Sequence, residues 1–373
     1  MTATAALRLD LDGLRTMPAQ VWGGIRLVPL VRDEPLPGLR LHRELYADGV
    51  GVVDVGDHTA YTSYIPHGFV ADWGAQPAAA YGTQLRGGRG APQPVEAMPL
   101  HVHRRMARRV AKRRLRFLPL HLALEGYLAL HFGGPAIAWE EWSLQALRRG
   151  LSPRVEEAYI GAEVSGLADA LRVFEIHPGQ CGVVLHTADA VAAAFAVPHP
   201  DDYRALHTTL VQDLYGDLIH HYALLGAPVQ DFVPRLDAGR IGSTADLRAA
   251  LAVQRREWAD FHSGTMAAGL LAPEYTARTV HRAGDFTLRR FLPAFRPRTE
   301  NHIGEAITAP DGRIAYLKTF RLSEAQIRRG HILSHLAAHD WHIPSAAAAL
   351  ALTPDDLATR IRASGFAHLL RHH

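Results

Sequence analysis

The segment HIGEAITAPDGRIAYLKTF, residues 302–320, constrains the fold more strongly than any other part of the sequence. Its centre is the P-D-G turn from Pro310 to Gly312, and a run of β-type residues flanks it on each side. A turn of this kind between two such runs predicts a β-hairpin. A second hairpin is indicated where CGVVLHTA and AVAAAFAV flank Asp189. Two hairpins of this type favour an antiparallel sheet.

The N-terminal part has the same character. From about Val21 to Leu85, short β-type runs alternate with Gly, Pro and Asp turn signals. Further along, RFLPLHLALEGYLALHFGGP predicts a pair of strands bent near Gly126, because its apolar positions are too dense for a solvated helix. These regions predict a sheet-rich first half of the chain.

Two helices are predicted within this frame. Asp201 and Asp202 give an acidic first turn to a helix whose leucines recur every four residues. Ser243 with Asp246 three residues later is a capping signature for a second helix. Its predicted broad apolar face consists of Leu247, Leu251, Trp258 and Phe261. The expected fold class is α+β, with a mainly antiparallel β-rich N-terminal and central region and packed helices.

Three helices are predicted at the C-terminus, over 323–339, 345–352 and 354–364. Their spacing, the Ala-rich middle helix and the ending L..RI...GF resemble the Fis-type helix-turn-helix. In such a motif the first turn of the last helix faces phosphate, but here that turn carries Asp355 and Asp356. DNA binding is therefore disfavoured, and packing, dimerisation or peptide docking is favoured. The expected domains are 1–235 (ligand or substrate domain), 236–321 (connecting helix and hairpin) and 322–373 (helix-turn-helix-like).

Composition limits the class of protein. The chain has 373 residues, of which 48% are hydrophobic and 21% charged, so it is expected to be globular rather than disordered. No apolar window is long enough to cross a bilayer. The single cysteine, Cys181, fits a reducing compartment. A cytoplasmic protein without membrane partners is expected.

The run RRMARRVAKRRLR, residues 104–116, contains no acidic residue. We expect a short helix there, with Val102, Met106 and Val110 as a thin apolar stripe. Arginine forks match phosphate and carboxylate geometry, so this helix predicts a site for an anionic ligand. The alternative is a charged surface helix without a ligand. The arginines predicted to bind are Arg104, Arg105, Arg108 and Arg109.

Histidines gather in sequence around Glu125, and strand alternation could bring some of them to one face with it. Such a face would provide an acid/base pair or part of a metal site, whereas the simpler alternative is hydrogen-bonded core histidines. The predicted catalytic residues are Glu125, His103, His121 and His131, and we expect no metal and no cofactor. Two weaker alternatives are Glu300, His302 and Glu305 as catalytic residues if the hairpin borders a cleft, and Lys318 as a phosphate-binding lysine. The sequence contains no Walker loop, G-x-G-x-x-G, H-E-x-x-H or G-x-S-x-G motif.

The middle of the chain resembles a known family. HLALEGYLALHFGG and the later strand QCGVVLH, followed by a hairpin and a helix, are similar to the intracellular domain family associated with ADP-ribosylglycohydrolase and rhodanese-phosphatase genes. Glu125 and Gly126 match its L-E-G element; Gln180 and Gly182 match its Q-x-G-V-V strand. The resemblance implies an α+β domain linked to ADP-ribose or nucleotide metabolism, with Glu125 and Gln180 as site residues. The polar stretch expected after Gly126 is replaced here by apolar residues.

Three functions follow from these observations. The leading hypothesis is an intracellular protein that binds an anionic small molecule or peptide, such as a nucleotide, ADP-ribose or an acidic peptide. The second is a cofactor-independent peptide-tailoring enzyme, for example a lyase or cyclase, using His/Glu acid-base chemistry. The third is a ligand-controlled DNA-binding regulator. A homodimer is a further expectation for the C-terminal helices.

Overall fold

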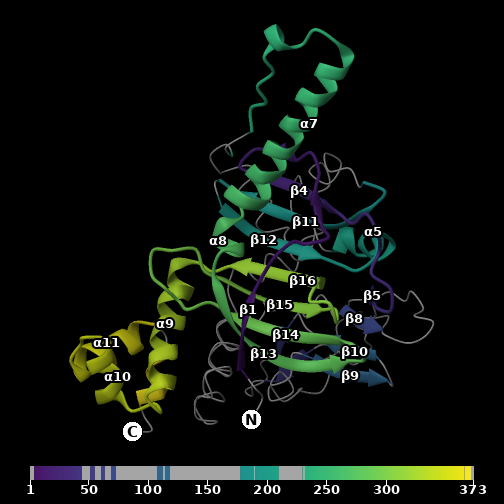
Figure 1. The fold of residues 1–373 in the computed structure, drawn as a ribbon. Coiled ribbons are helices and arrows are strands. Elements are labelled where there is room, and N and C mark those ends of the chain that lie inside the picture. Colours follow the sequence, from purple (N-terminus) through teal and green to yellow (C-terminus); the bar gives the residue numbers. More distant parts are fainter. Residues whose placement is uncertain are drawn as a thin grey trace.

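The fold is taken from a computed structural model (Figure 1). It describes residues 4–43, 177–188, 190–209, 229, 232–364 and 366–370. Five shorter strand segments are also described: 51–54, 60–63, 69–72, 107–111 and 114–117. The statements below concern these residues.

The central feature is a ten-stranded sheet in which every described pairing is antiparallel. The strand order is β1-β13-β14-β15-β16-β12-β11-β4-β2, and β3 pairs with β4. The strands are β1 (Thr4–Arg8), β2 (Arg15–Thr16), β3 (Gln20–Trp22), β4 (Ile25–Val31), β11 (Gln180–Thr187), β12 (Ala190–Ala196), β13 (Glu274–Ala283), β14 (Phe286–Leu292), β15 (His302–Thr308) and β16 (Ile314–Arg321). The coarse prediction of an α+β fold with an antiparallel sheet is confirmed.

Both predicted hairpins are present. β15 and β16 pair around the P-D-G turn, where Gly312 adopts a φ of 90° that glycine enters without steric cost. β11 and β12 form the other hairpin. In the sheet, β12 pairs with β16, so strands from either side of the expected domain boundary near residue 235 are hydrogen-bonded neighbours. That boundary lies within a connection between strands of one sheet.

Two smaller sheets are described. One has the order β5-β8-β10-β9 and the other pairs β6 with β7. Their strands are β5 (Arg40–Arg43), β6 (Gly51–Asp54), β7 (Ala60–Ser63), β8 (Phe69–Asp72), β9 (Ala107–Ala111) and β10 (Arg114–Phe117).

The predicted arginine-rich helix is wrong for residues 107–111 and 114–116, because β9 and β10 pair there as antiparallel strands. Arg108 and Arg109 therefore lie on a strand. A helix in this run would have only a thin apolar stripe to bury. As a strand, β10 pairs with β8 on one side and with β9 on the other, so its backbone groups are hydrogen-bonded on both sides.

The helices lie around the main sheet, as Figure 1 shows. They are α5 (Pro200–Thr209), η5 (Ala238–Arg240), α7 (Thr244–Asp260), η6 (Phe261–Thr265), α8 (Ala268–Leu271), α9 (Glu324–Ala338), α10 (Ile343–Ala349), α11 (Pro354–Ala363) and η7 (Ala367–Leu370). Ser243 caps α7 by accepting a hydrogen bond from the Asp246 backbone N–H, as predicted. Of the expected apolar face, Leu247 and Leu251 are exposed and Trp258 is half-buried, so α7 has no fully buried residue.

The core occupies both faces of the main sheet. Val183 and Val184, neighbours on β11, belong to two different apolar clusters because strand side chains alternate between faces. We call the Val183 side the first face and the Val184 side the second face. The first-face cluster contains Phe195 and Tyr316 and continues into α9, α10 and α11. The second-face cluster includes Leu270 of α8 and packs against Trp258 of α7.

The C-terminal helices are present at the predicted places, with Thr353 as the N-cap of α11. Their apolar residues, including Leu333, Leu357 and Ile361, belong to the first-face cluster. Phe295 packs on α9 at Gly330, where an added Cβ would lie 2.2 Å from the Phe295 ring. Packing against the sheet is thus one role of these helices, and their assignment as a helix-turn-helix module stays a prediction.

Candidate functional site

Four charged side chains form one lateral row across the strands β13, β14, β15 and β16. In the strand register, Arg278 is opposite Arg290, Arg290 is opposite Glu305, and Glu305 is opposite Lys318. Directly opposed residues of antiparallel strands project from the same face, so this charged row lies on the first face. Arg278 is exposed, whereas Arg290 is 9% exposed and Glu305 and Lys318 are fully buried. The row therefore runs from the surface into the core.

Glu305 is the centre of this row. Arg290 donates from Nε to Glu305 Oε1 at 2.7 Å, and the second carboxylate oxygen, Oε2, has no hydrogen-bond partner among the described residues. Burying charged groups costs several kcal/mol each unless close partners offset the loss of hydration. Charged side chains are seldom fully buried, and titratable groups with shifted pKa values are frequent at functional sites, so the row is our first candidate for a functional site.

The environment of Lys318 is apolar as well as charged. Its Nζ lies 5.7 Å from the centroid of the Phe320 ring. Burial lowers the pKa of Lys318 to about 7, although Glu305 acts in the opposite direction. The ammonium can therefore exchange a proton near neutral pH, which suits Lys318 to acid-base chemistry.

This pKa predicts how stability depends on pH. An unfolded lysine titrates near 10.5, so between about pH 7 and 10 the unfolded state binds more protons than the folded state. The free energy of unfolding should therefore rise with pH in this window, by at most about 1.4 kcal/mol per pH unit from this group. Urea titrations of wild type and Lys318→Met at several pH values would measure the difference. If the free energy of unfolding changed with pH equally in the two proteins, the lowered pKa of Lys318 would be refuted.

A second cluster lies on the second face. Arg26 of β4 is directly opposite His186 of β11. The ring of His262, which belongs to η6, lies next to His186, and the two ring centroids are 6.2 Å apart. His262 donates from Nδ1 to the Trp258 carbonyl at 2.8 Å, because a carbonyl can only accept. Arg26 lies over the Phe261 ring at 5.7 Å. We call Arg26, His186 and His262 the histidine cluster.

His186 has an unusual environment within this cluster. It is fully buried, and neither ring nitrogen has a hydrogen-bond partner among the described residues. Burial, His262 and Arg26 together lower the pKa of His186 to about 3, so the ring is neutral at pH 7. His262 is presented by a π-helix, a rare element that is frequent at functional sites. A neutral buried imidazole next to a second one is a candidate proton-transfer pair.

Gln180 is the one predicted site residue whose side chain is described. It is buried; its Oε1 accepts from the His177 backbone N–H at 3.1 Å and its Nε2 donates to the Gly182 carbonyl at 3.0 Å. These bonds shape the start of β11. A ligand-binding role for Gln180 stays a prediction.

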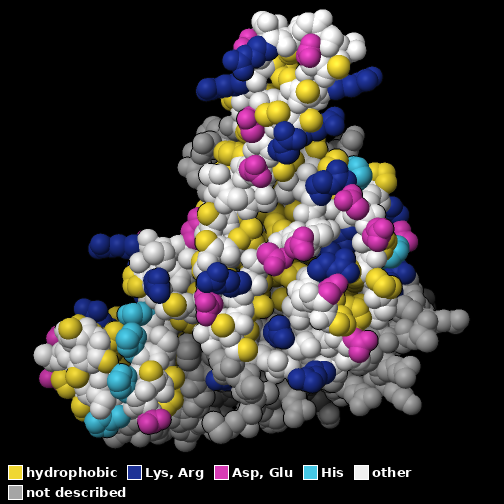
Figure 2. All heavy atoms as spheres, in the orientation of Figure 1, with side chains coloured by type: hydrophobic (Ala, Val, Ile, Leu, Met, Phe, Trp, Pro, Cys, Tyr) yellow, Lys and Arg dark blue, Asp and Glu magenta, His cyan; other side chains and the backbone are white. Residues whose placement is uncertain are grey.

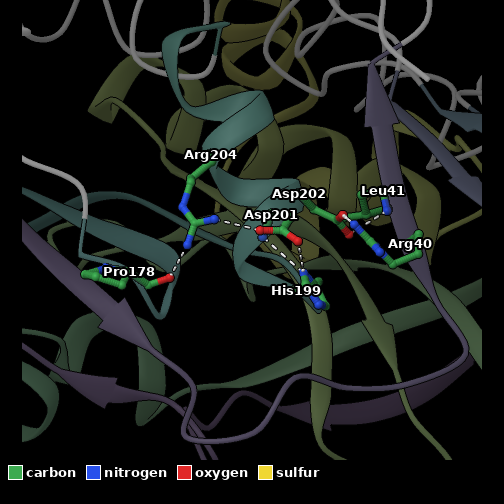
Figure 3. A network of polar contacts seen from close by, with 7 residues as sticks. All are labelled: Arg40, Leu41, Pro178, His199, Asp201, Asp202 and Arg204. Carbon is green, nitrogen blue, oxygen red and sulfur yellow. Dashed lines mark hydrogen bonds and ion pairs between the residues drawn. The ribbon is translucent and has the colours of Figure 1, made fainter. Parts of the chain in front are cut away.

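A polar network next to this turn fixes α5 (Figure 3). Arg40 donates to Asp202 at 2.7 Å, and the Leu41 backbone N–H donates to the same carboxylate, which joins β5 to α5. Arg204 bonds Asp201 at 2.7 Å and the Pro178 carbonyl at 2.6 Å. Burial raises the pKa of Asp202. All of these partners are explained by the packing of α5, so we assign the network a structural role.

The other predicted residues are placed less completely. Glu125, His103, His121, His131, Arg104 and Arg105 lie outside the described residues. For Arg108 and Arg109 the structure describes the backbone of β9 only. Whether these residues converge is therefore still a prediction. In the described part of the chain, no three His, Cys, Asp or Glu side chains are grouped so as to hold a metal ion.

In the sequence, Glu305 is a candidate only together with Glu300 and His302, and Lys318 is a separate one. No sequence pattern selects Arg26, Arg278, Arg290, His186 or His262. One sequence signal was available for the charged row. Glu305 and Lys318 lie at nearly equal distances along the chain before and after the P-D-G turn, so a hairpin places them nearly opposite each other. For the histidine cluster no sequence signal was available, since β4, β11 and η6 are far apart in the chain.

The fold and site define an α+β protein with buried charged groups on both faces of an antiparallel sheet. Among the helices that the structure describes, none has the length and apolarity needed to span a membrane. A family comparison matches residues 9–284 to the ARPP-2 family. The match covers more than half of the chain, which therefore belongs to the ARPP-2 family. No curated protein and no solved structure shows significant similarity to the chain.

The matched segment contains the histidine cluster but only part of the charged row. It ends at the turn between β13 and β14, so it includes Arg26, His186 and His262 but not Arg290, Glu305 or Lys318. The histidine cluster thus belongs to the part that the chain shares with its family. Most of the charged row lies in the strands that follow that part.

Proposed function

We propose that this protein binds an anionic small molecule of the nucleotide or ADP-ribose type, or an acidic peptide, at the charged row. The observation that carries the proposal is the alignment of three basic side chains with one carboxylate, from exposed Arg278 to buried Lys318. Guanidinium groups bind phosphate and carboxylate through paired hydrogen bonds, and a desolvated ammonium adds a point charge. The predicted basic segment at Arg108 and Arg109, now on a strand, remains part of this proposal.

The proposal predicts which variants lose ligand binding. Purified protein would be screened by thermal shift against nucleotides, ADP-ribose and short acidic peptides. We expect at least one of these anions to raise the melting temperature by several degrees, because a ligand that binds only the folded state stabilises it. Lys318→Met should abolish this shift while leaving the unliganded protein folded. Arg362→Gln, a charge removal on an exposed face of α11, is the control.

Two outcomes would contradict the proposal. One is that none of these anions stabilises the wild-type protein. The other is that a hit stabilises Lys318→Met as strongly as the wild type, which would place its binding site elsewhere.

A second function is favoured by the histidine cluster. A cofactor-independent enzyme could use His186 and His262 to transfer protons, because both rings are buried together and the His186 ring is neutral. Each screened compound would be incubated with the protein and analysed by mass spectrometry. Conversion that His186→Gln abolishes without loss of binding would support an enzyme, and unchanged compounds would leave binding as the function.

DNA regulation has weaker support. Asp355 and Asp356 are exposed in the first turn of α11, and Asp356 is also engaged with the capping Thr353. Carboxylates in that turn oppose phosphate, so DNA remains a disfavoured partner.

A further inference from the structure

A helical arm extends from the body of the protein. It consists of residues 232–256, in which an extended segment and η5 lead into the first three turns of α7. Figure 1 shows this part of α7 projecting beyond the main sheet. Every residue from 244 to 253 except Ala250 is exposed, and Ala250 is only half-buried. A helix this exposed gains little of the tertiary packing on which helices in proteins normally depend.

The arm nevertheless carries large apolar side chains. Leu247 and Leu251, one helical turn apart, are 38% and 39% exposed, and Val233 and Leu236 of the extended segment are 70% and 45% exposed. The two parts lie side by side, because the Arg235 backbone N–H donates to Gln254 Oε1 at 2.7 Å. These four side chains form what we call the arm strip. Figure 2 shows apolar and basic side chains together at this end of the molecule.

Basic residues border one side of this strip. At about 100° per residue, Arg248 and Arg255 flank the same side of the line through Leu247 and Leu251. Neither arginine forms an ion pair within the described part of the chain. The acidic residues of the arm have other roles, since Asp246 belongs to the helix cap and Asp237 pairs with Arg240.

This charge pattern distinguishes between two kinds of partner for the arm strip, a second copy of α7 and a helix of another protein. Two copies of α7 in antiparallel contact would set Arg248 of one against Arg255 of the other, which is repulsive. In a parallel pair the same arginines would face Ser243 and Ala250, which offer no charge. A partner helix with an apolar seam flanked by carboxylates would bury the strip and pair with both arginines.

We propose that the arm strip docks an acidic amphipathic helix of another protein. This goes beyond the proposed binding of an anion at the charged row, because it uses a different surface and a macromolecular partner. The seam would bury Leu247 and Leu251, and carboxylates beside it would pair with Arg248 and Arg255. The affinity should therefore depend on both apolar contact and salt.

The test uses a labelled synthetic helix of about three heptads with Leu along its seam and Glu along the one flank that would face Arg248 and Arg255. Fluorescence anisotropy with the full-length chain should show saturable binding that weakens as salt is raised. Leu251→Asp and the double variant Arg248→Glu/Arg255→Glu should each weaken it about tenfold or more, with unchanged melting temperatures, because all three residues are exposed. Arg362→Glu on α11 should bind as wild type does.

Several results would overturn this proposal. They are equal binding of a peptide with Lys in place of Glu, equal binding of a scrambled peptide without the seam, or affinities that neither arm variant changes. Binding of duplex DNA or phosphatidylserine vesicles in place of the peptide would also overturn it. So would a wild-type dimer in sedimentation that Leu251→Asp converts to monomer, because the strip would then be occupied by a second copy.

Discussion

Replacing Glu305 with Gln is expected to lower the free energy of unfolding by about 3–5 kcal/mol. The substitution keeps the size of the side chain but removes the carboxylate that accepts from Arg290 and faces Lys318, all within a buried environment. Removing one member of a buried charged network is costly because the remaining charges lose their partner. Urea unfolding monitored by circular dichroism would measure the loss.

Two other variants show whether the loss is specific to the buried carboxylate of Glu305. Glu324→Gln, in the exposed pair with Arg328 on α9, should cost no more than about 0.5 kcal/mol. Lys318→Met should cost far less than Glu305→Gln, since Glu305 keeps its bond to Arg290 and a buried ammonium is replaced by an apolar chain. A Glu305→Gln effect as small as that of Glu324→Gln would show that the charged row does not hold its charges in the folded protein.

Replacing Phe295 with Ala is expected to destabilise the protein by a similar amount, about 3–5 kcal/mol. Phe295 is 2% exposed and its ring packs on Gly330, which links the C-terminal helices to the sheet. Losing the ring leaves a cavity at this contact. Because the helices share the first-face core, we expect one cooperative transition rather than two.

Hydrogen exchange can separate this expectation from its alternative. If residues 322–373 were an independent module, Phe295→Ala would raise exchange in α9, α10 and α11 and leave the sheet protected. Because the C-terminal helices and the sheet share one core, we expect faster exchange in the helices and in the sheet. Gly330→Ala is the matched variant, because it overfills the same contact and should cost about 1–3 kcal/mol.

Much of the fold could be predicted from local patterns. The turns at Asp189 and Pro310–Gly312 and the caps at Ser243 and Thr353 depend on neighbouring residues alone, and the structure contains each element they predict. The strands β9 and β10 lie where a helix is predicted, because the helical spacing of Val102, Met106 and Val110 is a weak signal within an arginine-rich run. Its pairing with β8 depends on a distant part of the chain.

The site was harder to predict for a related reason. The charged row exists because three hairpin registers place Arg278, Arg290, Glu305 and Lys318 side by side. A shift of one residue in any of those registers would send a side chain to the other face. The exposed face of α7 was also missed, because an apolar stripe in a sequence does not reveal whether another part of the same chain covers it.

The central claim is that the charged row binds an anion, and isothermal titration calorimetry tests it most directly. The ligand would be whichever nucleotide, ADP-ribose or acidic peptide gives the largest thermal shift. The proposal predicts saturable binding to the wild-type protein and an affinity at least about tenfold lower for Lys318→Met, equivalent to about 1.4 kcal/mol or more. Equal affinity for the two proteins would contradict it.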